Sequence, residues 1–262
     1  MANISVRFFS NRLKRFTSFQ VFLPNDVFED MPDTLENPYL KRNLKTLFLL
    51  HGYGSDGFNW IPDELAVKYN FAVVIPSGEN SFWLDGISTG HEYYRFLGEE
   101  LVEYVRKTFG LAKKREDSYL MGYSMGGFGA LHTSLAYPDI FSKAVCLSSA
   151  LIVHEVAEMK DGIGNDIANF AYYRECFGEP GKVLESDNNP ETLLKKLKES
   201  GKPIPEIIMS VGTEDILLEK NRDMHKFLES EGVEHVYEEA EGNHDMTFWN
   251  KCVQKYVPII FE

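Results

Sequence analysis

One serine of this chain lies between two glycines in the pattern Gly122-Tyr-Ser-Met-Gly126. The pattern follows an apolar run, residues 118–121, and opens a run with helical spacing, which predicts a sharp turn from a strand into a helix. Such a turn lifts the side chain of Ser124 clear of a sheet, where its hydroxyl could act as a nucleophile in acyl transfer. The alternative is a tight glycine-rich turn that carries a solvated serine.

A serine nucleophile needs a base and a group that orients the base. His244, one of seven histidines, is the predicted base, because it lies in a loop directly after the last predicted strand. The acid is expected in Gly212-Thr-Glu-Asp215, the loop after the preceding strand. Asp215 is preferred because a short carboxylate near a strand end suits the orienting role, and Glu214 is the alternative.

The tetrahedral intermediate of acyl transfer also needs hydrogen-bond donors for its negative oxygen. His51-Gly-Tyr-Gly54 directly follows the apolar run 45–50, and this glycine-rich turn can point backbone N–H groups at the space above Ser124. The predicted donors are the N–H groups of Tyr53 and Met125. His51 is expected to be structural, with its ring bonded to nearby backbone.

Short apolar runs alternate with amphipathic segments from residue 45 to the end of the chain. This alternation is typical of an α/β fold with a mainly parallel central sheet and helices on both faces. A hairpin and a polar loop that extends to about Arg42 precede it. The predicted strands are 4–9, 17–23, 45–50, 71–75, 118–122, 144–148, 205–211 and 233–238, and the predicted helices are 58–69, 91–109, 125–137, 191–199, 217–231 and 245–256.

Residues 150–203 interrupt this alternation with several glycines, prolines and asparagines. A connection of this length predicts an insertion with short helices of its own. It is either a surface excursion or a small cap over the site, and we favour the cap because loops at that edge of a sheet usually shape pockets. The absence of internal repeats and long linkers predicts one domain, residues 1–262.

The composition excludes several classes of protein. The net charge of −13 over 262 residues argues against nucleic acid and anionic membranes as partners, because both attract basic surfaces. Three cysteines are too few for a disulfide framework. The N-terminal residues lack the pattern of a secretory signal, so a cytoplasmic location is the simplest expectation, although a mature secreted chain would look the same. A homo-oligomer stays open.

The chain resembles α/β-hydrolase esterases of the esterase D type, a group that includes tributyrin esterases and the feruloyl and acetyl xylan esterases of carbohydrate esterase family 1. The resemblance covers nearly the whole chain. It implies that the catalytic triad lies at Ser124, Asp215 and His244, and that Gly52 and Trp83 belong to the substrate-binding site. An aromatic side chain packed under a helix is the alternative for Trp83. The matching segments are residues 50–54, 122–131, 212–215 and 242–245 with Phe248 and Trp249.

The resemblance implies a serine carboxylesterase that acts on short-chain or aryl esters, either small molecules or carbohydrate-linked. Such a mechanism needs no metal or cofactor. A thioesterase of the S-formylglutathione hydrolase kind, or an acyltransferase, is the alternative; the turn at His51 and the residue Phe128 both depart from the pattern of that branch. A ligand-binding module on a hydrolase scaffold is the alternative outside enzymes.

Overall fold

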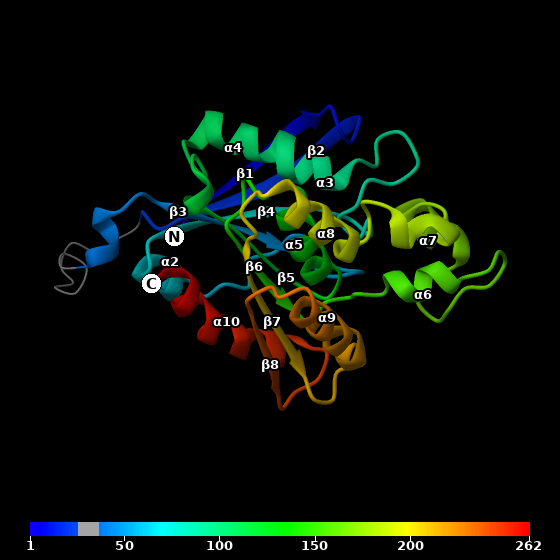
Figure 1. Cartoon of the computed structure of the whole chain (residues 1–262). Helices are drawn as coiled ribbons and strands as arrows, with labels where there is room; N and C mark the ends of the chain where they lie inside the picture. The colour runs from blue at the N-terminus through cyan, green and yellow to red at the C-terminus, as the bar shows by residue number, and fades with distance from the viewer. Residues whose placement is uncertain (26–36) are drawn as a thin grey trace.

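The computed structural model describes residues 1–25 and 37–262, and its strands form one twisted sheet (Figure 1). The order across this sheet is β1-β2-β4-β3-β5-β6-β7-β8. The hairpin β1–β2 joins β4 antiparallel, and the strands from β4 to β8 are parallel. The strands are β1 (Ala2–Ser10), β2 (Arg15–Leu23), β3 (Lys45–Leu50), β4 (Phe71–Pro76), β5 (Ser118–Tyr123), β6 (Lys143–Leu147), β7 (Glu206–Gly212) and β8 (His235–Ala240).

Helices cover both faces of the sheet, because buried side chains of the central strands alternate between two apolar clusters. In β3, Phe48 and Leu50 face one cluster, and Leu47 and Leu49 face the other. The first cluster is covered by α3 (Tyr93–Arg95), the π-helical segment η2 (Phe96–Leu101), α4 (Val102–Phe109), α5 (Met125–Ala136), α8 (Pro190–Ser200) and α9 (Leu218–Ser230). The second is covered by α2 (Asp63–Lys68) and α10 (Met246–Phe261) (Figure 1).

The predicted mainly parallel sheet with helices on both faces is therefore confirmed. The predicted helix 58–69 is wrong in its first half, because α2 begins only at Asp63, after Pro62. Asn59 instead accepts a hydrogen bond from the Ile61 N–H, which closes a turn before the proline. The predicted polar loop falls largely on residues 26–36, outside the described residues. The short helix η1 (Pro38–Lys41) follows them.

The predicted insertion lies between β6 and β7 and consists of α6 (Val153–Glu158), α7 (Phe170–Phe177), η4 (Pro180–Glu185) and α8. Helices α6 and α7 project beyond the end of the sheet at which the chain leaves β5 to enter α5 (Figure 1). The boundaries of a single domain stay a prediction. None of the helices within residues 1–25 and 37–262 is both long and apolar enough to cross a membrane.

Candidate active site

Ser124 occupies the turn between β5 and α5 with a strained backbone, φ 54° and ψ −120°. The strain is tolerated because glycine gives the turn room. A Cβ on Gly126 would lie 2.2 Å from the carbonyl oxygen of Leu50 in β3, a distance that no real contact allows. Strained, non-glycine residues of this kind concentrate at functional sites. The predicted strand–turn–helix geometry is present, with the serine at its apex.

A continuous chain of hydrogen bonds starts at this serine. The Oγ of Ser124 lies 2.9 Å from Nε2 of His244, and Nδ1 of the same ring lies 3.0 Å from both carboxylate oxygens of Asp215. The three residues come from loops after β5, β8 and β7, whose carboxyl ends meet at one edge of the parallel sheet. The structure therefore brings together all three side chains that the sequence singled out as nucleophile, base and acid.

The neighbouring carboxylates have other partners. Glu214, the alternative acid, accepts hydrogen bonds from the Gly242 N–H at 3.1 Å and from the Thr213 hydroxyl at 2.9 Å. It therefore ties the β7 loop to the β8 loop. Asp245, next to His244 in sequence, accepts the N–H of Phe248 and caps α10. Of the two candidate acids, Asp215 is the one that contacts the imidazole.

The side chain of Asp215 is fully buried, with 0% exposure. Burial raises the pKa of this carboxyl, but hydrogen bonds from His244, Ser148 and the Leu217 N–H, together with the charge of His244, lower the pKa below its usual value on balance. The carboxylate is therefore ionised at neutral pH. A buried anion that keeps its charge can stabilise an imidazolium cation beside it.

The loop after β3 lies against the nucleophile. A Cβ on Gly52 would lie 2.7 Å from the ring of Tyr123 and 3.2 Å from Cβ of Ser124, so only a glycine lets the chain pass this close. The next residue is Tyr53, whose N–H is one predicted donor. The other predicted donor, the Met125 N–H, belongs to the first residue of α5, and N–H groups there have no acceptor within their own helix.

His51 is held by backbone, as the sequence predicted. The Gly78 N–H donates to Nε2 of the ring at 2.9 Å, so Nε2 is an acceptor and Nδ1 carries the proton that it shares with the Gly52 carbonyl. Burial lowers the pKa of this ring, which keeps it neutral. His51 therefore fixes the shape of the loop from within.

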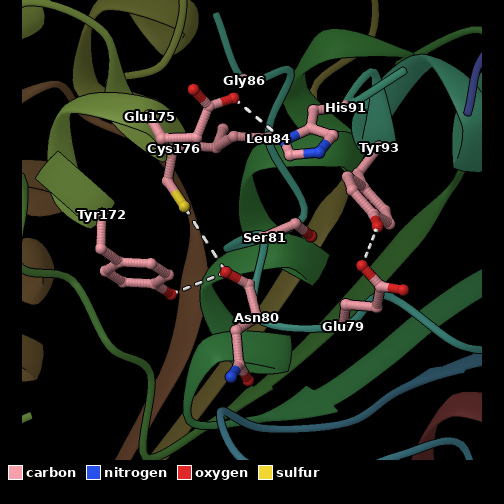
Figure 2. A pocket seen from close by; sticks show the side chains of 10 residues that line it. All are labelled: Glu79, Asn80, Ser81, Leu84, Gly86, His91, Tyr93, Tyr172, Glu175 and Cys176. Carbon is pink, nitrogen blue, oxygen red and sulfur yellow. Dashed lines mark hydrogen bonds and ion pairs between the residues drawn. The ribbon is translucent and has the colours of Figure 1, made fainter. Parts of the chain in front are cut away.

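The same loop is held from the outside by Asn80. Its side-chain oxygen accepts the Gly54 N–H at 2.8 Å, and its carbonyl accepts the Tyr172 hydroxyl at 2.7 Å (Figure 2). Tyr172 belongs to α7, and its ring meets the ring of Tyr53 edge-on, with centroids 5.6 Å apart. The Tyr53 hydroxyl also reaches the Ile167 carbonyl at 3.5 Å. The insertion therefore braces the loop that carries one predicted donor.

The structure corrects the predicted role of Trp83. This side chain is 0% exposed, so it offers no surface to a substrate in this conformation. Its indole N–H donates to the His51 carbonyl at 3.2 Å, and its ring lies against Gly129 of α5, where a Cβ would come within 2.6 Å. The alternative, an aromatic side chain packed under a helix, describes its position.

The remaining histidines are engaged elsewhere. His154, at the start of the insertion, pairs with Glu191 of α8 at 2.8 Å. His132 donates to the Asp187 carbonyl, and His91 pairs with Glu175 of α7 in the pocket shown in Figure 2. His225 and His235 bond to one another at 2.8 Å. Among the described residues, no group of three or more His, Cys, Asp or Glu side chains is arranged to hold a metal ion.

Comparisons with known proteins show the family of the chain. A family model described as "Putative esterase" matches residues 10–257. This chain belongs to that esterase family. An acetyl esterase of Caldicellulosiruptor saccharolyticus is 41% identical over 258 residues, which span 97% of this chain and 96% of that protein.

Solved structures extend the comparison to the fold. FphF of Staphylococcus aureus, a fluorophosphonate-binding serine hydrolase solved with substrate bound, is 28% identical with a TM-score of 0.81 and covers 100% of this chain and 98% of its own. The S-formylglutathione hydrolase FrmB of the same organism is 28% identical with a TM-score of 0.80, over 100% and 99%. The predicted α/β-hydrolase fold is confirmed, and the protein is an esterase.

Two contacts of the site were missed by the sequence analysis. Asn80 carries no motif, and its bond to the loop after β3 spans 26 positions of the chain. Ser148, which helps to lower the pKa of Asp215 by hydrogen bonding, follows an apolar strand in an ordinary serine pair. Its position at the carboxyl end of β6, between the strands that lead to Ser124 and Asp215, is the signal that could have found it.

Proposed function

We propose that this esterase is a serine carboxylesterase that works through Ser124, His244 and Asp215 and forms an acyl-enzyme. The observation that carries the proposal is the unbroken chain of hydrogen bonds from Ser124 through His244 to the buried carboxylate of Asp215. Nucleophile, base and orienting acid in hydrogen-bond reach of one another define this kind of site on unrelated folds.

Acylation begins when Oγ of Ser124 attacks the carbonyl carbon of the ester. His244 takes the hydroxyl proton on Nε2, because Nδ1 keeps its proton in the bond to Asp215. Asp215 stabilises the imidazolium that forms. His244 then gives the proton to the departing alcohol oxygen, and the carbon–oxygen bond of the ester breaks to leave the acyl group on Ser124.

The negative oxygen of the tetrahedral intermediate is bound by the N–H groups of Met125 and Tyr53. Met125 begins α5, where the positive end of the helix dipole adds to the hydrogen bond. Loss of one such donor typically costs about 3–4 kcal/mol of transition-state stabilisation. Water then attacks the acyl-enzyme, with His244 again acting as base, and the carboxylic acid leaves.

We propose neutral esters with a small acyl group, acetyl first, as substrates, either as small molecules or carried on a carbohydrate. The acetyl esterase relative supports this choice, because it is 41% identical over nearly the whole chain. The net charge of −13 opposes the approach of anionic substrates. Butyryl and feruloyl-type esters belong to the same proposed class.

A thioester substrate is the second candidate. It is favoured by the likeness to FrmB, the S-formylglutathione hydrolase of Staphylococcus aureus, at 28% identity over the whole chain. The same serine chemistry cleaves both kinds of bond, since only the leaving group differs. Turnover of acetyl, butyryl, octanoyl and feruloyl esters and of S-formylglutathione, compared by kcat/KM, separates the two candidates.

The triad is tested with p-nitrophenyl acetate and the variant Ser124→Ala. We expect turnover to fall by at least about 10³-fold while the circular dichroism spectrum stays that of the wild type. Activity of the folded variant close to that of the wild type would refute the assignment. A wild-type protein that neither turns over esters nor reacts with a fluorophosphonate would instead be a binding module.

A further inference from the structure

Ser148 follows β6 in a conformation that serine rarely adopts. Its φ is 45°, in the left-handed region, and its side chain is 0% exposed. The backbone is held there by the bond from the Ser148 N–H to the carbonyl of Ser210 in β7, at 2.8 Å. Strain of this kind persists only where the surroundings over-determine it. Ser148 is also one of the hydrogen-bonding groups that lower the pKa of the buried Asp215 carboxyl.

Trp249, in the first turn of α10, determines which way that hydroxyl points. Its indole N–H donates to Oγ of Ser148 at 3.0 Å. An indole nitrogen can only donate, so the oxygen of Ser148 is the acceptor in this bond. The one hydroxyl proton of Ser148 is then free to be donated to Asp215, which as an ionised carboxylate can only accept.

The ring of Trp249 also contacts Tyr123, which precedes the nucleophile, and the imidazole of His244. It stacks on the ring of Tyr123 at 4.2 Å between centroids and 21° between planes. It meets the His244 ring edge-on at 5.1 Å and 88°. One side chain therefore contacts the strand under Ser124, the imidazole and the hydrogen-bond partner of Asp215.

We propose that Ser148 and Trp249 are positioning residues that extend the hydrogen-bonded chain to Ser124–His244–Asp215–Ser148–Trp249 and hold the carboxylate in the orientation that catalysis needs. The inference rests on the proposed function of the triad. Asp215 accepts the Leu217 N–H at 2.8 Å and lies 3.0 Å from Nδ1 of His244, and Ser148 is a third donor whose hydrogen bonding lowers the pKa of the carboxyl. With three donors around it, the carboxylate cannot rotate without breaking a bond inside a buried space.

The indole N–H of Trp249 reaches Asp215 only through Ser148, and this order of contacts makes the proposal testable by a double-mutant cycle. The variants are Ser148→Ala, Trp249→Phe and the two together. Phenylalanine keeps a ring against Tyr123 and His244 but has no N–H. The matched controls are Ser134→Ala, a buried serine bonded to a backbone carbonyl, and Trp60→Phe, a tryptophan whose ring also contacts Tyr123.

We expect Ser148→Ala to lower kcat for p-nitrophenyl acetate about 10- to 100-fold, the range for a hydrogen bond to a charged group, with KM changed less than about 3-fold. Trp249→Phe should lower kcat about 3- to 10-fold on its own. In the Ser148→Ala background it should have no further effect beyond about 2-fold, because its target is gone. Both control variants should keep wild-type kcat.

Folded variants with kcat at the level of the controls would overturn the inference, and so would effects that simply multiply in the double variant. If Ser148→Ala does not fold, Trp249→Phe against Trp60→Phe decides alone. The two proposals fail differently. Ser124→Ala with wild-type activity removes the triad itself, whereas an inactive Ser124→Ala beside fully active Ser148 and Trp249 variants removes only the extended chain.

Discussion

The substitution Asp215→Asn changes one atom of the candidate site and tests which way the imidazole must face. In the wild type, one oxygen of Asp215 accepts the Leu217 N–H at 2.8 Å, and both oxygens lie 3.0 Å from Nδ1 of His244. An asparagine that keeps its carbonyl on Leu217 turns its NH₂ toward His244. Nδ1 must then accept, so Nε2 carries the proton and cannot take one from Ser124.

We expect the variant to lose catalysis by His244, which can act as base only with its proton on Nδ1 and Nε2 free. This corresponds to about 10³- to 10⁴-fold in kcat, or roughly 4–5.5 kcal/mol of transition-state stabilisation. The matched control is Glu214→Gln, the same change at the adjacent, exposed carboxylate. Its bonds to Gly242 and Thr213 do not touch the imidazole, so we expect kcat to stay within about 3-fold of the wild type.

The assay is the initial rate with p-nitrophenyl acetate near pH 8, with kcat and KM determined separately and folding checked by thermal denaturation. A loss of less than about 10-fold in folded Asp215→Asn would refute the reasoning. Equal losses in both variants would make Glu214 a second partner of the base.

Two other predictions concern buried rings outside the chain of hydrogen bonds. Burial lowers the pKa of His132 to about 4, so between pH 6.5 and 4 the unfolded chain binds a proton at this ring that the folded protein does not. The free energy of unfolding should therefore fall by about 2–3 kcal/mol as the pH drops through this range. Urea titrations should show less of this fall in His132→Gln, and an equal fall in both proteins would contradict the cause. Trp83→Phe should lower the free energy of unfolding by about 2 kcal/mol, because it leaves a cavity and removes the hydrogen bond to the His51 carbonyl. The KM for p-nitrophenyl acetate should change less than about 3-fold. A large rise in KM without a loss of stability would instead make Trp83 a substrate contact.

The candidate triad could be predicted because each member lies in the loop that follows a strand of the parallel sheet. In a parallel sheet those strand ends meet at one edge, so residues 124, 215 and 244 converge although 120 positions separate the first from the last. The structural role of His51 likewise followed from its place in the turn directly after a strand. The role of a residue could therefore be predicted from the sequence where a short motif lies at the end of a predicted strand.

The contacts that the sequence did not reveal all depend on long-range packing. The burial of Trp83 follows from the fit between its ring and Gly129, which no periodic pattern encodes. Tyr172 braces the loop after β3 from inside an irregular insertion (Figure 2). The helix predicted over residues 58–69 begins too early. The prediction followed the apolar spacing of residues 58–61, whereas α2 begins at Asp63, directly after Pro62.

The most direct measurement of the central proposal is the mass of the protein after reaction with a fluorophosphonate, followed by peptide mapping. We expect one adduct per chain, located on Ser124, and none in Ser124→Ala. The rate of labelling should fall in Asp215→Asn, because the same base activates the serine toward phosphorus. An adduct on any other residue, or unchanged labelling of Ser124→Ala, would contradict the assignment of Ser124 as the nucleophile.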